Sequence, residues 1–195
     1  ACTDFAEPAS APPRVRLGIQ PHAPYSVSLP AYRAAADLAE RLGAPLCTHL
    51  AESPDERQFI TFGSGPLAAL LKAVGVWDPS VEDAVGFGVS PVQHLADVLR
   101  RSPLACVHLN NLSKADIAIL ALASGAGCTA VYCPRASAYF GFEQAFGAHK
   151  YRDLLNSGVP VALGTDSIVN LPKGIGRLST WAEMRFLRGR AGVAG

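Results

Sequence analysis

The sequence predicts an α/β fold in which the strands of a parallel sheet alternate with helices. Short apolar runs recur along the chain, and the segments between them carry helix-capping residues. Hydrophobic residues make up 49% of the 195 residues and charged residues 17%, a composition typical of a chain with a packed core. We therefore expect one domain over residues 15–188, with a linker or loop over residues 1–14 and a loop over residues 189–195.

The apolar runs are the predicted strands. Continuous apolar runs of this short length are typical of strands that are buried in a parallel sheet. The expected strands cover residues 15–20, 46–49, 104–108, 129–133 and 159–163.

Serine residues indicate where the helices begin. Ser28, Ser53, Ser90 and Ser113 each precede a helical stretch, where a serine side chain can accept a hydrogen bond from the first turn. Glu56 follows Ser53 at the spacing of a capping box. The expected helices cover residues 28–43, the segment after Ser53, residues 66–75, 91–101 and 113–124, a segment that ends at 152–156, and residues 178–188.

Polar residues stand at the ends of the predicted strands. His22, His49 and His108 end or follow three of them, and Asp166 follows the last. Singly, each would more often be a cap or a satisfied core residue. Together they are expected to converge, because ligands bind at the carboxyl ends of parallel strands. Imidazoles and a carboxylate suit Zn²⁺, Fe²⁺ or Mn²⁺, and a catalytic metal keeps one position for water, whose pKa it lowers toward neutrality.

Glu52 lies three residues beyond His49 and has two interpretations. It can be a general acid and base that carries a proton from water to a leaving nitrogen. It can instead be an exposed residue that precedes the helix after Ser53. We favour the catalytic interpretation because a candidate metal ligand stands beside it. His94 and His149 are interpreted as surface or packing residues.

Charge and hydropathy exclude several classes of protein. Seventeen Lys and Arg residues balance sixteen Asp and Glu residues, so the chain lacks the basic surface that binds nucleic acid. No apolar run approaches the roughly 20 residues of a membrane helix, and the first residues do not form a signal peptide. We expect a cytoplasmic protein that acts on a small molecule, with no nucleic-acid or membrane partner.

The cysteine and glycine patterns add little chemistry. The five cysteines show no C-x-x-C pair and are interpreted as free thiols packed as small hydrophobic residues in a reducing compartment; a zinc-thiolate or disulfide role is the alternative. The chain contains no G-x-G-x-x-G or Walker motif and no G-x-S-x-G motif, so neither phosphate binding nor a serine hydrolase is indicated.

Five motifs, taken in order, resemble those of the amidohydrolase superfamily. The most similar branch holds the nucleobase and nucleoside deaminases and the triazine hydrolases, including guanine deaminase and methylthioadenosine/S-adenosylhomocysteine deaminase. The resemblance runs from Leu17 to Phe186. The motifs are residues 21–26 (PHAPYS), 48–52 (THLAE), 107–113 (VHLNNLS), 132–137 (YCPRAS) and 163–167 (LGTDS).

This resemblance implies a partial (β/α)₈ TIM barrel, made of the C-terminal five strand-helix units, with the motifs at strands four to eight. It implies one divalent metal ion, Zn²⁺ or alternatively Fe²⁺ or Mn²⁺, with His49 and Asp166 as ligands. Asp166 would also take a proton from the metal-bound water. A homo-oligomer is a further expectation from the resemblance.

The other residue roles follow from the same resemblance. Glu52 would be the proton shuttle, and His108 would polarise the substrate or the leaving group. His22 and Arg135 would face the substrate.

The chain departs from the family pattern at several places. The first strand of the family ends in His-x-His, which supplies two metal ligands, and no His-x-His occurs here. Asn111 stands where the deaminase branch often has a second histidine, and Ala138 follows Ser137 where asparagine is usual. A whole barrel needs about 250 residues. The simplest account is that three N-terminal units and some C-terminal sequence are lacking, so this chain alone is expected to be inactive.

The sequence therefore predicts a metal-dependent hydrolase that deaminates an aminated heterocycle, such as a purine-like base or nucleoside. One alternative is a degenerate half-barrel that serves as a non-catalytic binding or assembly module. Another keeps the metal site but cleaves a ring amide C–N bond or a C–Cl bond.

Overall fold

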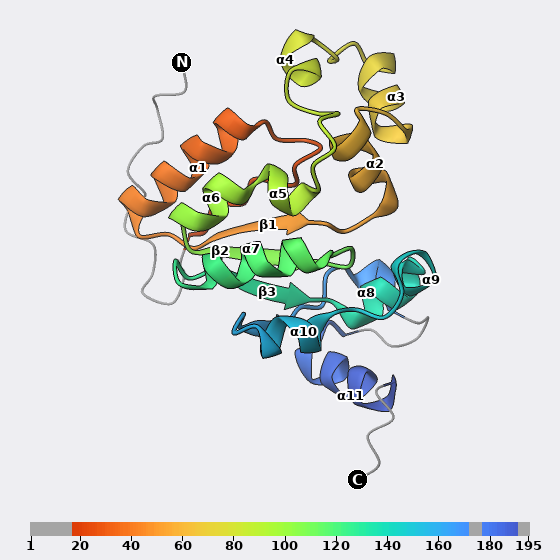
Figure 1. Ribbon diagram of the computed structural model, residues 1–195. Helices are drawn as coiled ribbons and strands as arrows, with labels where there is room; N and C mark the ends of the chain where they lie inside the picture. Colours follow the sequence, from red (N-terminus) through yellow and green to blue (C-terminus); the bar gives the residue numbers. More distant parts are fainter. Residues whose placement is uncertain (1–16, 172–176, 191–195) are drawn as a thin grey trace.

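A parallel sheet lies at the centre of the protein, in a computed structural model that describes residues 17–171 and 177–190 (Figure 1). The sheet has the strand order β1-β2-β3-β4, so each strand pairs with its neighbours in the sequence. All pairings are parallel. The strands are β1 (Leu46–Leu50), β2 (Leu104–His108), β3 (Thr129–Tyr132) and β4 (Val161–Leu163).

The first predicted strand is reduced to an extended segment beside β1. Within its described part, Ile19 forms a single parallel bridge to Leu46. Backbone hydrogen bonds from Ile19 N to the carbonyl of Pro45 and from His49 N to the carbonyl of His22 continue this contact. The beginning of that strand, the predicted linker over residues 1–14 and residues 191–195 of the predicted C-terminal loop lie outside the described residues.

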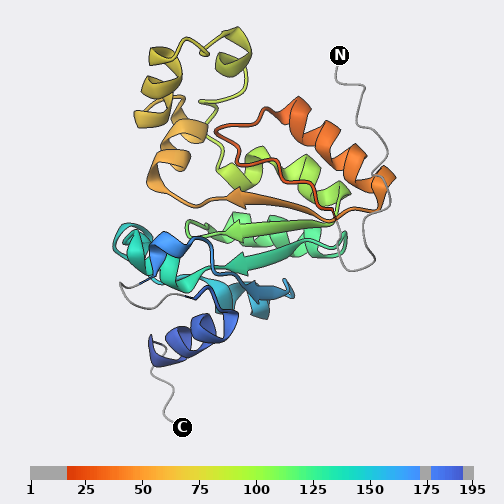
Figure 2. The ribbon, with the colours of Figure 1, turned by 180° about the vertical axis from the view of Figure 1, so that it is seen from behind.

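Helices fill the connections between the strands. In Figure 2, which shows the molecule from behind, β1 and β2 lie in front of the helices over residues 96–101 and 114–124, so these helices pack on the other face of the sheet. The helices are α1 (Leu29–Leu42), α2 (Pro54–Phe62), α3 (Pro66–Ala73), α4 (Pro79–Glu82), α5 (Pro91–His94), α6 (Ala96–Arg101), α7 (Lys114–Ser124), α8 (Pro134–Tyr139), α9 (Phe142–Phe146), α10 (Tyr151–Asn156) and α11 (Thr180–Arg190), with a 3₁₀ turn, η1, at Ile168–Asn170.

The main core lies between the sheet and the helices that cover it. Leu46, Leu50, Leu104 and other apolar residues of the strands are buried there against α1, α6 and α7. Each fully buried side chain of this kind contributes about 1.5–3 kcal/mol. Thr48, also fully buried, is satisfied by a 2.6 Å hydrogen bond with the hydroxyl of Tyr32 on α1.

A second, smaller core supports the connection between β1 and β2. Helices α2, α3 and α4 project beyond the end of β1 (Figure 1). They pack around Phe59, Ile60, Ala68 and Val85. The long connection therefore has its own apolar support.

Most predicted helices are confirmed, with three corrections. The helix expected over 91–101 is divided at Leu95 into α5 and α6, although the predicted cap at Ser90 forms a complete capping box with Gln93. The last helix runs to Arg190, so residues 189 and 190 of the predicted loop are helical. Helices α4, α8 and α9 were not predicted. No helix of the described segments is long and apolar enough to cross a membrane.

Candidate metal centre

The carboxyl ends of three strands bring His49, His108 and Asp166 together. One potential ligand atom from each residue lies within 4.8 Å of those of the other two. The imidazoles of His49 and His108 are stacked with their ring centres 5.3 Å apart. The ring of His22 lies 5.0 Å from that of His49. The four polar residues predicted at strand ends are therefore neighbours in the structure.

The backbone at this edge of the sheet has an unusual conformation. Among the described residues, the non-glycine residues with positive φ are Ala51 (52°), His108 (78°), Leu109 (53°) and Asp166 (55°). All four lie at or just beyond the ends of β1, β2 or β4. Left-handed backbone costs an ordinary residue about 1–2 kcal/mol. Such strain persists only where the surroundings hold it, and it concentrates at functional sites.

His49 is oriented by the neighbouring extended segment. Its Nδ1 lies 2.9 Å from the backbone carbonyl of His22, which leaves Nε2 as the free nitrogen. The side chain of His22 is itself held by a 2.7 Å hydrogen bond between its Nδ1 and Ser26 Oγ. Partial burial and the neighbouring His49 lower the pKa of His22. Its imidazole is therefore mainly neutral at pH 7.

His108 is a buried, neutral imidazole. Burial, together with His49 and His149, lowers its pKa to about 3. Its Nε2 is buried and lacks a hydrogen-bond partner among the described residues. Glu52 Oε1 lies 3.5 Å from this nitrogen. Because the imidazole is neutral at pH 7, this approach is not an ion pair, and Nε2 is available to a ligand.

Glu52 lies beside these imidazoles in a largely buried position. Its side chain is 19% exposed. Burial and the nearby Asp166 raise the pKa of Glu52, while His49 acts in the opposite direction. A raised pKa brings a carboxyl group closer to the operating range of a general acid and base.

Glu56 holds the backbone that carries Glu52. Its fully buried carboxylate accepts hydrogen bonds from the backbone N–H groups of Ala51 (2.9 Å) and Glu52 (2.6 Å). The capping box predicted for Ser53 and Glu56 is therefore only half formed. Ser53 accepts from Glu56 N, but the Glu56 side chain turns to the strand end instead. With Ala51 in the left-handed conformation, the N–H groups of Ala51 and Glu52 both point to the Glu56 side chain. Two hydrogen bonds are more favourable than the single bond that the N–H of Ser53 would provide.

Asp166 is oriented by a residue that the sequence analysis did not single out. Asn170, in the turn η1, donates a 2.7 Å hydrogen bond from Nδ2 to Asp166 Oδ2. Asn170 is 3% exposed, so this contact is shielded from water. The spacing of an aspartate and an asparagine four residues apart after a strand is the signal that could have identified it.

Arg135 is engaged by another element. Its Nε donates to Glu183 Oε1 at 2.6 Å, and its backbone N–H donates to Glu183 Oε2 at 3.0 Å. The guanidinium is buried, and its Nη2 lacks a partner among the described residues. Arg135 also lines a cavity of about 720 Å³ between α8 and α11. A role toward substrate stays a prediction for this residue, as it does for His22.

The cysteines of the described chain are free thiols, as predicted. Cys106, Cys128 and Cys133 are buried and Cys47 is partly exposed. Burial raises the pKa of Cys133 to about 12, so this thiol is protonated at pH 7. Cys2 lies outside the described residues.

The donor set fits a divalent metal ion. Catalytic zinc sites use three nitrogen or oxygen ligands from the protein and leave a position for water. Here two imidazoles and a carboxylate converge. His49 and Asp166 each have a hydrogen bond that fixes the side chain, as ligands of metal sites do. The Nε2 of His108 has no partner among the described residues, so it stays available to a ligand beside these donors.

Comparison with known sequences places the chain among metal-dependent hydrolases. The profile of the amidohydrolase family matches residues 5–193. Aminodeoxyfutalosine deaminase of Deinococcus radiodurans is 34% identical over 164 residues, which cover 81% of this chain and 37% of that protein. The 5-methylthioadenosine/S-adenosylhomocysteine deaminase of Teredinibacter turnerae is 32% identical over 155 residues, covering 79% of this chain and 28% of that protein. The chain thus spans about a third of the length of these relatives.

Solved structures show the same fold. Aminofutalosine deaminase of Helicobacter pylori matches with a TM-score of 0.64 and 18% identity, covering 83% of this chain and 38% of that one. An adenosine deaminase of Xanthomonas campestris with bound zinc matches with a TM-score of 0.56 and 22% identity, covering 89% of this chain and 33% of that one. These likenesses confirm the predicted fold class, a partial (β/α)₈ barrel.

Proposed function

The chain belongs to the amidohydrolase family, and we propose that it carries the C-terminal strands of a hydrolase that deaminates an aminated heterocycle. The convergence of His49, His108 and Asp166 within 4.8 Å, with Glu52 beside them, is the observation that carries this proposal. The deaminases named above support it because about a third of the aligned residues are identical, over 164 and 155 residues respectively. A purine-like base or nucleoside is the proposed class of substrate.

Zn²⁺ is the proposed metal, with Fe²⁺ or Mn²⁺ as alternatives that suit the same donors. His49 and Asp166 are the proposed ligands, and His108 Nε2 faces the same space. When bound, such a metal acts as a Lewis acid that makes water a nucleophile near neutral pH. The relatives are about three times as long as the matched region. We propose that sequence beyond this chain, or a partner chain, supplies the other ligands and barrel strands.

Glu52 moves the proton in the proposed reaction. Water adds to the ring carbon that bears the amino group, the C–N bond breaks, and ammonia leaves while the ring keeps the oxygen. Glu52 takes a proton from the attacking water and delivers it to nitrogen. Its raised pKa and its low exposure suit this exchange.

His108 contributes a hydrogen bond rather than a charge. Because its pKa is far below 7, the ring stays neutral and its buried Nε2 can pair with the reacting part of the substrate. His22 and Arg135 are the proposed contacts to the remainder of the substrate. A cytoplasmic location and a homo-oligomer complete the proposal.

The test compares three variants of the natural full-length chain that carries this sequence. Ammonia release is measured over a panel of aminated purines and pyrimidines, and metal content by elemental analysis. Glu52→Ala should lower kcat by about 10²–10⁴-fold with the metal retained, because a general acid and base contributes that much. Asp166→Ala should lose both activity and metal.

Glu40→Ala is the matched control, since Glu40 is an exposed carboxylate on α1 at the opposite end of the sheet. It should keep the activity of the wild type. Wild-type turnover in both Glu52→Ala and Asp166→Ala would contradict the proposed mechanism. A metal-free wild type without deaminase activity would favour a non-catalytic module.

A further inference from the structure

His149 contacts the end of β2 from a distant part of the chain. It lies in the connection between α9 and α10 and is 8% exposed. Its Nε2 lies 2.7 Å from the backbone carbonyl oxygen of His108. A carbonyl oxygen only accepts, so Nε2 carries the hydrogen. The ring is also stacked on Tyr132 of β3, with the ring centres 3.7 Å apart and the planes inclined by 16°.

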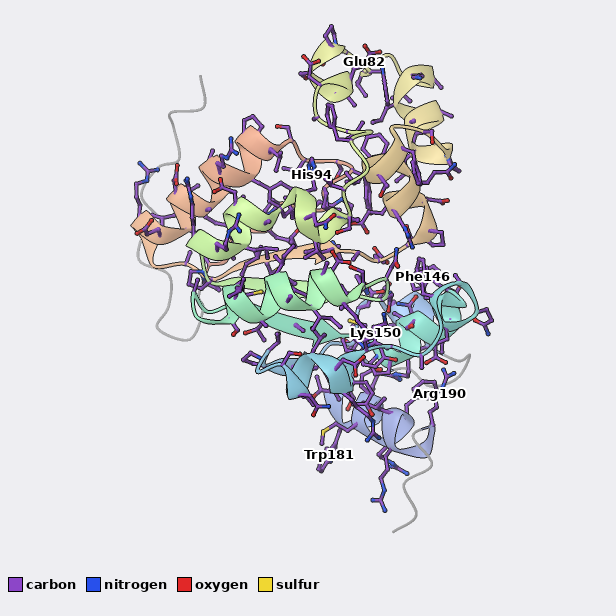
Figure 3. All side chains as sticks on the ribbon, in the orientation of Figure 1. Glu82, His94, Phe146, Lys150, Trp181 and Arg190 are labelled. Atoms are coloured by element: carbon purple, nitrogen blue, oxygen red, sulfur yellow. The ribbon has the colours of Figure 1, made fainter. Side chains whose placement is uncertain are left out.

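Lys150 makes a parallel contact one residue later. Its Nζ donates to the backbone carbonyl of Leu112 at 2.5 Å, and Figure 3 labels it near α10. His149 and Lys150 therefore bind the first and last carbonyls of the segment 108–112. This segment carries His108 into the candidate metal centre and leads from β2 to α7.

The segment 108–112 needs this support because of its backbone conformation. His108 and Leu109 are consecutive non-glycine residues with φ of 78° and 53°. On one side the segment is tied to the β1 end, since Leu109 N donates to the Leu50 carbonyl and Asn111 N to the Ala51 carbonyl. These bonds satisfy two of its N–H groups. The bonds from His149 and Lys150 satisfy the carbonyls of His108 and Leu112.

We propose that His149 is a positioning residue for His108. Its hydrogen bond fixes the peptide group of His108 in the left-handed conformation that directs the imidazole toward His49 and Asp166. The chemistry of this role rests on the proposed function. His149 itself does not contact the donor atoms, and it acts through the backbone of His108.

The test separates the hydrogen bond from the packing. His149→Phe keeps a planar ring against Tyr132 and removes the donor, whereas His149→Gln keeps an N–H donor and removes the ring. Both are made in the natural full-length chain with ¹⁵N-labelled histidine. The readouts are the imidazole ¹⁵N signals of His108 at pH 7.5, kcat and KM, and the free energy of unfolding.

The Phe variant should show shifted or broadened His108 signals and a kcat about 10²-fold lower with little change in KM, because a misplacement of about 1 Å has that cost. The Gln variant should keep the His108 signals and most of the rate, although it too is less stable. Lys150→Met, which removes the second donor, should shift the same signals by a smaller amount.

His94→Phe is the matched control. His94 ends α5 and is also a partly buried histidine whose pKa burial lowers, but it lies at another cavity, beside Tyr25 and Val85. It should leave the His108 signals unchanged. Unchanged His108 signals and kcat in His149→Phe, or equal changes in His94→Phe, would overturn the proposal. If no substrate is deaminated but His149→Phe alone shifts the His108 signals, the proposed function fails and the positioning role stands.

Discussion

Residues with positive φ lie at both ends of the sheet, but they are of different types at the two ends. At the amino ends, positive φ is supplied by glycines such as Gly43 (56°) and Gly127 (93°). At the carboxyl ends it is supplied by Ala51, His108 and Asp166, which carry side chains. Glycine adopts this conformation without steric cost. The backbone at the carboxyl ends is therefore more strained than at the amino ends. This strain is tolerated because side chains at the carboxyl ends form the candidate metal centre.

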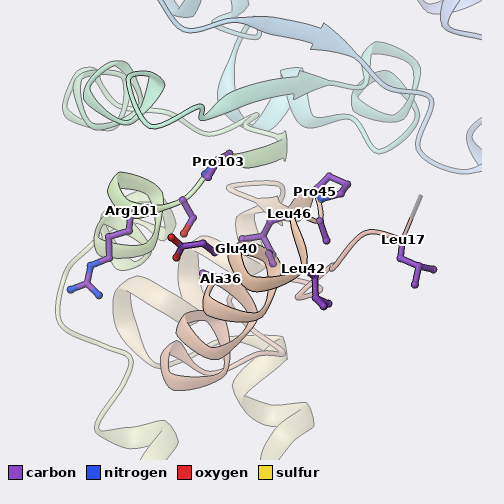
Figure 4. A pocket seen from close by; sticks show the side chains of 12 residues that line it. Leu17, Ala36, Glu40, Leu42, Pro45, Leu46, Arg101 and Pro103 are labelled. Carbon is purple, nitrogen blue, oxygen red and sulfur yellow. The ribbon is translucent and has the colours of Figure 1, made fainter. Parts of the chain in front are cut away.

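Polarity differs between the two ends as well. The amino ends border a cavity of about 850 Å³, lined largely by apolar residues such as Leu17, Leu42 and Pro45 (Figure 4). The carboxyl ends instead bury polar atoms that lack partners among the described residues, including His108 Nε2 and Asn170 Oδ1. Unpaired buried polar atoms cost free energy. One end of the sheet is therefore built for stability and the other for binding.

A substitution at the amino ends should have the largest effect on stability. In Gly127→Ala the new Cβ would lie 3.0 Å from the Cβ of Pro103, at a φ of 93°. We expect a loss of about 3 kcal/mol in the free energy of unfolding, from strain and overpacking together. Chemical denaturation measures it. Metal affinity of the folded variant should be unchanged.

Gly125→Ala is the control for that experiment. Gly125 has an ordinary helical φ of −63°, and its Cβ would meet only the Leu122 carbonyl at 3.6 Å. It should therefore be close to neutral. Equal destabilisation by both substitutions would show that the left-handed backbone at Gly127 is not what matters.

At the carboxyl ends, removal of a supporting side chain should affect binding more than stability. Asn170→Ala deletes the hydrogen bond to Asp166. Loss of such an outer partner lowers metal affinity by about 10–100-fold. Competition with a Zn²⁺ chelator measures this, with Ile168→Ala as the control because Ile168 is exposed in the same turn. Unaltered Zn²⁺ affinity in Asn170→Ala would contradict the role of Asp166 as a ligand.

Glu56 should make the stability of the carboxyl end depend on pH. Burial raises its pKa from 4.5 to about 7, although the backbone amides of Glu52 and Ala51 oppose this shift. Between pH 4.5 and about 7, Glu56 is therefore protonated in the folded state and ionised in the unfolded state. The stabilisation is complete below pH 4.5 and is lost as the pH rises to about 7.

Glu56→Gln removes this titration. Between pH 5 and 7.5 the wild type should lose about 2.4 kcal/mol more unfolding free energy than the variant does. Using the difference between the two proteins cancels the opposite contribution of the buried histidines. Parallel pH profiles would show that Glu56 is ionised throughout.

The smallest effect is expected where strain and packing oppose each other. Ala51→Gly relieves a φ of 52° but removes a methyl group that is 1% exposed. The two terms nearly cancel, so stability should change by less than about 0.5 kcal/mol. Ala39→Gly on α1 has no strain to relieve and should cost about 1.5 kcal/mol. Equal losses in the two variants would argue that Ala51 is not strained.

The sheet and the strand-end residues were predictable because their signals are local. The run from Leu104 to Val107 is apolar throughout and forms most of the strand β2. The cap at Ser113 begins α7, where its side chain accepts from Asp116 N. Once the strands are parallel, their ends share one edge, so the placement of His49 and Asp166 at the same edge follows from topology.

The supporting residues were not predictable because their contacts cross the fold. Glu56 has the spacing of a capping residue, and only the left-handed backbone at Ala51 diverts it. His149 was interpreted as a surface or packing residue, and its stacking on Tyr132 agrees with the latter. Its bond to His108 joins residues 41 positions apart, which no local pattern encodes.

The hydrogen bonds at the carboxyl ends that join residues far apart in the sequence also affect how the protein folds. Asn110 Nδ2 reaches the Glu52 carbonyl across 58 positions, and Arg135 reaches Glu183 across 48. Contacts of such sequence separation require large loops to close, so they form late. We therefore expect the donor cluster to be completed on the native side of the folding barrier. A bound metal ion would then lower the unfolding rate and leave the folding rate unchanged. The folded protein would persist longer, but it would not form faster.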